Sequence, residues 1–102
     1  MIEMKEEMLA ELQAGKTPAV IFVHTPFCAT CQLAEKMLII LEEASPQQTF
    51  YRLNASLFPE FMRVNKIESV PALLLLKNGE IRDKLYAFES VTKLFGVLNE
   101  WV

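Results

Sequence analysis

Residues 19–23 form an uninterrupted apolar run, Ala-Val-Ile-Phe-Val, in which three of the five side chains are β-branched. A short run of this kind, without alternation between apolar and polar residues, is typical of a strand that is buried on both faces. Pro26 follows shortly afterwards and ends the extended segment. The sequence therefore predicts a sheet that holds this strand in its interior and is covered on both sides.

The rest of the chain alternates between helical and extended patterns. Asn78-Gly79 is a strong hairpin signal, because both positions of such a turn favour positive φ. Helical spacing of apolar residues and the positions of Gly and Pro predict the other boundaries. The expected helices cover about 1–12, 28–44, 58–64 and 91–102, and the expected strands cover 19–23, 49–54, 72–77 and 80–86. This order predicts a single α/β domain, residues 1–102, without repeats or linkers.

Composition and charge exclude several classes of protein. With 102 residues the chain is too short for a TIM barrel, and with 52% hydrophobic residues it can bury a core. Its net charge of −3 argues against nucleic acid or an anionic membrane as a partner. The first residues lack a signal-peptide pattern, and no apolar stretch approaches the ~20 residues that span a bilayer. We therefore expect a cytoplasmic protein.

The chain has two cysteines, Cys28 and Cys31, whereas a small secreted scaffold normally carries four or more. A bridge between them would close a very small loop and add little stability. Both lie where the predicted strand gives way to a predicted helix, whose free N–H groups and dipole favour a thiolate. Cys28, at the end of the helix, is the expected nucleophile, and Cys31, one turn further in, is the expected resolving thiol.

Two other interpretations of the cysteine pair remain open. A structural zinc site takes four ligands, and with one histidine the chain would need carboxylates or dimerisation to complete the set. The pair could also consist of inert thiols packed in a helix. Exposure at a helix start favours a redox role over both, so we expect a redox-active disulfide and no metal.

Four segments of the chain occur in the order and at the spacing of a known family. They are Ala19–Val23, Phe27-Cys28-Ala29-Thr30-Cys31, Val70-Pro71-Ala72-Leu73 and Lys77-Asn78-Gly79-Glu80, and together they resemble the thioredoxin family over nearly the whole chain. The resemblance implies the thioredoxin fold, with a central mixed sheet flanked by helices. Because the chain starts directly with a helical pattern, we expect the family's N-terminal strand to be absent. The expected sheet then has four strands in the spatial order 49–54, 19–23, 72–77 and 80–86.

The same resemblance implies a dithiol–disulfide oxidoreductase that acts on protein disulfides and serves cell redox homeostasis. It implies a cis bond before Pro71, which would let the backbone of Val70 pair with an extended substrate segment. Phe27, beside Cys28, completes the expected substrate-binding residues. No cofactor is expected, recycling by a thioredoxin reductase or a low-molecular-weight thiol is implied, and we expect a monomer. The alternative is a thioredoxin-fold binding or adaptor protein with vestigial cysteines.

The sequence departs from the family pattern at several positions. Phe27 replaces the usual tryptophan before the first cysteine, and Ala29-Thr30 replaces the usual glycine-proline. The buried acid that thioredoxins place beneath the second cysteine aligns with Phe22, and the lysine that would pair with that acid aligns with Arg52. Tyr86 takes the place of a glycine that borders the substrate groove, so we expect a narrower or reshaped groove.

Two residues near the cysteines are candidates for a proton relay. His24 lies four residues before Cys28 and could stabilise its thiolate when charged, or shuttle protons. Glu35 lies four residues after Cys31 on the same helix face and could relay protons through water. The alternatives are a partly buried, hydrogen-bonded histidine and a solvated helix carboxylate.

Overall fold

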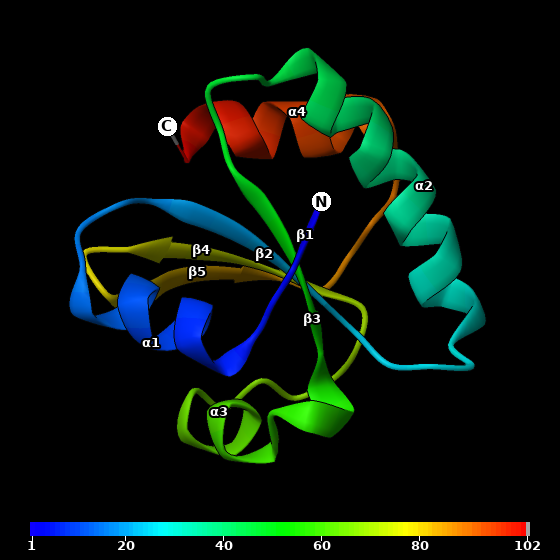
Figure 1. Cartoon of the computed structure of the whole chain (residues 1–102). Helices are drawn as coiled ribbons and strands as arrows, with labels where there is room; N and C mark the ends of the chain where they lie inside the picture. Colours follow the sequence, from blue (N-terminus) through cyan, green and yellow to red (C-terminus); the bar gives the residue numbers. More distant parts are fainter. Residues whose placement is uncertain (102) are drawn as a thin grey trace.

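The computed structural model describes residues 1–101 as a five-stranded sheet with helices on both sides (Figure 1). The strands are β1 (Ile2–Glu3), β2 (Ala19–His24), β3 (Phe50–Asn54), β4 (Ala72–Lys77) and β5 (Glu80–Leu85). The helices are α1 (Glu6–Ala14), α2 (Ala29–Ala44), α3 (Pro59–Val64) and α4 (Val91–Glu100), and a 3₁₀ turn (Ala55–Leu57) joins β3 to α3. The spatial order is β1-β3-β2-β4-β5. The sheet is mixed, because β1 and β2 run parallel to β3 whereas β4 runs antiparallel to β2 and β5.

The apolar run that predicted a doubly buried strand is confirmed as β2, in which every residue is buried. Ala19, Ile21 and Val23 belong to the core on the side of α1 and α3. Val20 and Phe22 belong to the core on the side of α2 and α4. Figure 1 shows these two pairs of helices on opposite sides of the sheet. Since both faces of β2 are covered, its sequence needs no polar alternation.

The turn signal of the sequence is also confirmed. Asn78 and Gly79 have φ angles of 54° and 79° and connect β4 to β5 as an antiparallel hairpin. Ser90 precedes α4, and its side chain accepts a hydrogen bond of 3.1 Å from the backbone N–H of Lys93. The four strands that the sequence predicts therefore occur, and they occur in the expected spatial order.

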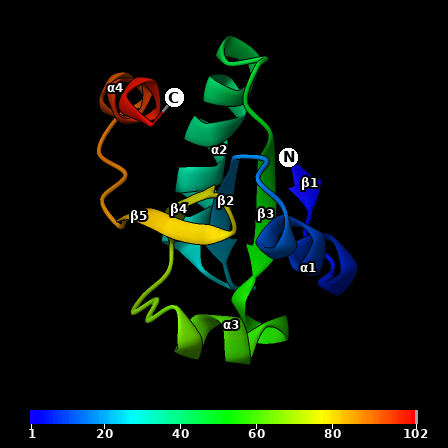
Figure 2. The same ribbon diagram turned by 90° about the vertical axis from the view of Figure 1, so that its left-hand side faces the viewer.

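The expected absence of an N-terminal strand, with a helix from residue 1, is wrong. Ile2 and Glu3 form β1, which pairs with β3 at the edge of the sheet (Figure 2), and α1 begins only at Glu6. Both side chains of β1 are exposed, so the strand has no apolar pattern to reveal it. It is held by backbone pairing, which a hydrogen bond of 2.8 Å from Met4 N to Arg52 O continues. The buried Met4 side chain produced the apparent helical spacing.

Within residues 1–101, no helix combines the length and the hydropathy that a bilayer crossing needs. In the same range, no three His, Cys, Asp or Glu side chains are grouped so that they could hold a metal ion.

Candidate active site

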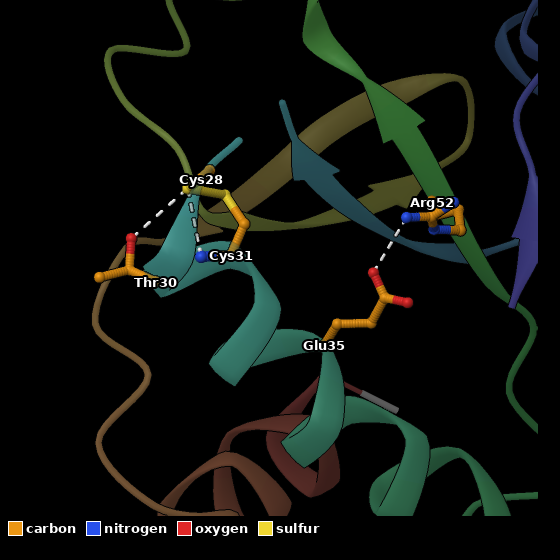
Figure 3. Close-up of a disulfide and its surroundings, with 5 residues drawn as sticks. All are labelled: Cys28, Thr30, Cys31, Glu35 and Arg52. Carbon is orange, nitrogen blue, oxygen red and sulfur yellow. Dashed lines mark hydrogen bonds and ion pairs between the residues drawn. A yellow bond between two sulfur atoms is a disulfide. The ribbon is translucent and has the colours of Figure 1, made fainter. Parts of the chain in front are cut away.

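Cys28 is the N-cap residue of α2, and its sulfur takes part in the capping. The backbone N–H of Cys31 donates a hydrogen bond of 3.2 Å to Cys28 Sγ, and the N–H of Gln32 donates one of 3.1 Å to the Cys28 carbonyl. The Thr30 hydroxyl lies 3.5 Å from the same sulfur (Figure 3). Cys28 and Cys31 are joined as a disulfide, with their Cα atoms 5.2 Å apart. When the bond is reduced, the sulfur at the cap keeps a backbone donor that favours its thiolate.

The two cysteines differ in their access to solvent. Cys31 has an exposed fraction of 3% and packs with Phe22, Ala34 and Leu38 in the core between the sheet and α2. Cys28 is only partly buried at the rim of the same core. The preceding residue, Phe27, is fully exposed and has a left-handed φ of 62°, which is unusual for a bulky side chain. An incoming sulfur can therefore reach Cys28, whereas Cys31 is shielded behind it.

The start of α2 is electrostatically suited to a thiolate. Its first turn contains no acidic residue that would oppose a negative charge. The unpaired N–H groups of this turn and the helix dipole both favour an anion at the N-terminus, where Cys28 lies. These features favour the thiolate over the thiol at Cys28 when the disulfide is reduced.

The segment that leads into β4 lies beside the end of β2. The peptide bond between Val70 and Pro71 is cis. Ala72 pairs with Val23 in the antiparallel register of β4 and β2, so Pro71 is level with His24, where β2 ends and the cysteine loop begins. Val70 packs as a partly buried residue against the same core as Cys28 and Cys31. The two chain segments that the sequence singled out are thus neighbours at one end of the sheet.

His24 ends β2 with a buried side chain, whose exposed fraction is 8%. Its ring stacks on Phe22, with a centroid distance of 5.6 Å and an interplanar angle of 19°. The Nε2 atom is buried and has no hydrogen-bond partner in the described structure. Burial, and after it the positive charge of Arg52, lower the pKa of His24 below its ordinary value. His24 is therefore neutral at physiological pH, with one ring nitrogen free to accept a proton.

Arg52 links three elements around this site. From β3, its Nη1 donates to Glu3 Oε1 on β1 at 2.8 Å, and its Nη2 donates to Glu35 Oε1 on α2 at 3.0 Å. Figure 3 shows the second of these ion pairs one turn beyond Cys31 on α2. Glu35 is therefore a partly exposed helix carboxylate that also pairs with a guanidinium on β3.

A cleft of about 280 Å³ brings the candidate residues together. Both cysteines line it, and so do His24, Glu35 and Arg52, with Thr25, Pro26, Phe27 and Gln32 completing its wall. The sequence predicted four of these charged or sulfur-bearing residues as site residues. It did not predict that Arg52 lines the cleft or that Arg52 pairs with Glu3 and Glu35, since the Glu3 partner depends on β1. The cleft thus combines a disulfide, an imidazole and an ion pair.

Comparison with known protein families matches a model described as Thioredoxin to residues 1–100. The chain belongs to the thioredoxin family. One relative of this thioredoxin-family chain, the Thioredoxin-like protein YusE of Bacillus subtilis, is 42% identical over 80 residues, which cover 78% of this chain and 76% of YusE. Thioredoxin-1 of Saccharomyces cerevisiae is 30% identical over 61 residues, which cover 60% of this chain and 59% of that protein.

A solved structure extends this likeness to the fold. A chain from a study of thiol resolution in yeast mitochondrial 1-Cys peroxiredoxin, through the glutathione and thioredoxin systems, superimposes with a TM-score of 0.80. The match covers 98% of this chain and 94% of that one at 17% identity, so it bears on the fold alone. The predicted thioredoxin fold is confirmed, with β1 as an additional strand. Family membership together with the Cys28–Cys31 pair indicates a redox function.

Proposed function

We propose that this chain is a dithiol–disulfide oxidoreductase that acts on protein disulfides, with Cys28 as nucleophile and Cys31 as resolving thiol. The observation that carries the proposal is the asymmetry of the pair at the start of α2. Cys28 Sγ accepts the Cys31 N–H at the helix cap and is partly accessible, whereas Cys31 is buried behind it. A nucleophile needs access and a stabilised thiolate, and a resolving thiol needs proximity and protection from outside reagents.

The proposed reaction has two exchange steps. The Cys28 thiolate attacks one sulfur of the substrate disulfide, and the other substrate sulfur leaves as a thiolate that takes up a proton. Cys31 then loses its proton and attacks Cys28 Sγ, which releases the second substrate thiol and forms the Cys28–Cys31 bond. The substrate disulfide gains two electrons, and the protein dithiol loses two. The direction reverses if the substrate dithiol is the stronger reductant.

Phe27, Val70 and Pro71 form the proposed substrate-binding surface. Phe27 offers a fully exposed aromatic ring directly before the nucleophile. The segment 70–71 lies level with the end of β2, where its backbone groups would pair with an extended substrate strand. The Tyr86 hydroxyl accepts a hydrogen bond of 3.3 Å from the backbone N–H of Glu68, which ties its ring to the approach to this segment. We expect Tyr86 to narrow the substrate groove.

Thiol exchange needs no organic cofactor, because the electrons reside in the Cys28–Cys31 pair. A thioredoxin reductase or a low-molecular-weight thiol would return the oxidised pair to the dithiol. The use of the two cysteines for exchange rather than for a structural disulfide fits the reducing cytoplasm. A monomeric protein with a single domain, residues 1–102, completes the proposal.

Reduction of insulin by dithiothreitol tests the proposal against the adaptor alternative. The wild-type chain should accelerate the precipitation of reduced insulin. Cys28→Ser should return the rate to that of dithiothreitol alone, because the remaining Cys31 thiol is buried and shielded from the substrate. Folding of the variant is checked by circular dichroism. A wild-type rate equal to the background would favour an adaptor with vestigial cysteines and contradict the proposed enzyme.

A further inference from the structure

The resolving step requires a proton acceptor near Cys31. The Cys31 sulfur lies in an apolar core beside Phe22. Burial in such a place disfavours the thiolate that Cys31 must become in the resolving step. Phe22, on the strand beneath, can neither accept a proton nor hold a water molecule by hydrogen bonds. The acceptor must therefore come from another side chain that shares the cleft with Cys31.

Besides the cysteines, three ionisable side chains line the cleft: Arg52, Glu35 and His24. Arg52 carries donors only, so it cannot accept a proton. Glu35 is an acceptor, but one of its oxygens receives the Arg52 Nη2 donor at 3.0 Å. The remaining group is His24, whose buried Nε2 has no partner in the described structure. An imidazole is also closer in basicity to a thiol than a carboxylate is, and proton transfer is more efficient when the two are better matched.

The position of His24 on β2 directs its ring toward the side of the sheet that holds Cys31. Side chains two residues apart on a strand share a face, and the stacking of His24 on Phe22 shows that these two do so. Phe22 belongs to the core on the side of α2, as Cys31 does. His24 therefore lies one step nearer to the cysteine end of the strand than Phe22, on the same face.

We propose that His24 is the general base that takes the Sγ proton of Cys31 during resolution, with the Glu3–Arg52–Glu35 ion pairs holding the wall of the cleft around it. This inference rests on the proposed function, because it assigns a role within the same two-step exchange. The proton passes from Cys31 Sγ to His24 Nε2, directly or through one water molecule, for which a cleft of about 280 Å³ has room. The Cys31 thiolate attacks Cys28 Sγ, the substrate thiolate leaves, and it takes its proton from the imidazolium.

The charges around His24 determine how the step depends on pH. Arg52 on β3 lowers the pKa of His24, whereas Glu3 on β1 and Glu35 on α2 raise it, and burial is the largest influence. Because the net effect is a lowered pKa, His24 is in its neutral, proton-accepting form at pH 7. As the pH falls through that lowered pKa, below about 6.5, the imidazole becomes protonated and resolution should slow.

The test follows the decay of a Cys28–thionitrobenzoate adduct, formed with a single equivalent of the chromogenic aryl disulfide, by the release of thionitrobenzoate. His24→Phe keeps an aromatic ring to stack on Phe22 and removes the base. It should slow the decay by on the order of 10²-fold at pH 7 and abolish the acid-side inflection, while adduct formation by Cys28 is unchanged. Glu35→Gln should keep the inflection but move it to lower pH, because one carboxylate that raises the pKa of His24 is lost.

A second measurement uses the wild-type chain and does not depend on the folding of a variant. The chain has one histidine, so its imidazole signals in a proton NMR titration belong to His24. The midpoint should differ between the dithiol and disulfide forms, because only the dithiol offers a proton partner. Equal midpoints, or an inflection that survives in His24→Phe and disappears in Glu35→Gln, would overturn the assignment to His24. A wild-type adduct that forms but never decays would instead contradict the resolving role of Cys31, and with it the proposed function.

Discussion

Replacing Cys31 with Ser should leave the chain covalently linked to its substrate, whereas replacing Cys28 with Ser should prevent such links from forming. The two variants should differ because Cys28, at the cap of α2, is accessible to a substrate, whereas Cys31, one turn further in, is buried. Without Cys31, the mixed disulfide at Cys28 has no internal thiol to displace the substrate. Without Cys28, the remaining thiol is shielded from outside disulfides, and its burial disfavours the thiolate.

This prediction is checked with oxidised insulin and the reduced proteins, by non-reducing electrophoresis and mass spectrometry. The Cys31→Ser chain should accumulate one insulin adduct per molecule, located at Cys28, and the wild type should accumulate very little. Cys28→Ser provides the matched control, because it retains one cysteine of the pair. Adducts on Cys31 in the Cys28→Ser chain, at a rate similar to that of Cys31→Ser, would reverse the roles of the two thiols.

The substitution Phe22→Asp should destabilise the fold and yet accelerate resolution. Phe22 is fully buried and contacts the His24 and Phe88 rings at centroid distances of 5.6 and 6.2 Å. Loss of that packing should lower the free energy of unfolding by about 3–5 kcal/mol, and burial of a carboxylate without partners should lower it further. The new carboxylate would lie beneath Cys31 and offer the resolving thiol a second proton acceptor.

The stability of Phe22→Asp should depend on pH in a defined direction. Burial raises the pKa of an aspartate above its unfolded value of about 3.9, so the folded state binds the proton more tightly. The penalty for the buried charge is then absent below that unfolded pKa and grows as the pH rises through the raised folded pKa. Urea denaturation should show the variant closer to the wild type at pH 4 than at pH 8.

The matched control for the rate effect is Phe22→Leu, which loses part of the same packing and adds no acid. Stopped-flow decay of the Cys28–thionitrobenzoate adduct near neutral pH should be faster in Phe22→Asp and unchanged in Phe22→Leu. Phe22→Asp should also restore the decay that His24→Phe slows. If the decay is unchanged in a folded Phe22→Asp protein, removal of the Cys31 proton is not the slow step. The presence of Phe22 in place of the buried acid of thioredoxins would then not slow resolution.

The elements that the sequence predicted well are those whose signals are local. The run Ala19–Val23 has no polar alternation because both faces of β2 are covered, and Asn78-Gly79 supplies two positive φ angles for one tight turn. Each of these signals follows from a few neighbouring residues. The junction of β2 and α2 could be predicted for the same reason, since Cys28 and Cys31 lie within one turn of each other at a helix start.

The features that the sequence did not predict depend on contacts across the sheet. β1 has only two residues, and both of their side chains are exposed. Because the strand pairs with β3 through its backbone, its sequence shows no apolar pattern typical of a strand. Without β1, the ion pair of Glu3 with Arg52 could not be foreseen. The pairing of Arg52 with Glu35 likewise depends on how β3 lies against α2, although the spacing from Cys31 already placed Glu35 on the correct helix face.

Equilibration of the protein in glutathione and dithiothreitol redox buffers tests most directly whether Cys28 and Cys31 form an exchange-active couple. Thioredoxin-fold oxidoreductases have reduction potentials of about −120 to −270 mV, whereas structural disulfides lie below about −300 mV. We predict that the pair converts between dithiol and disulfide as a two-electron couple with a midpoint above about −300 mV. If the pair is still oxidised in a buffer poised at about −300 mV, it is a structural disulfide. That result would contradict the proposed oxidoreductase.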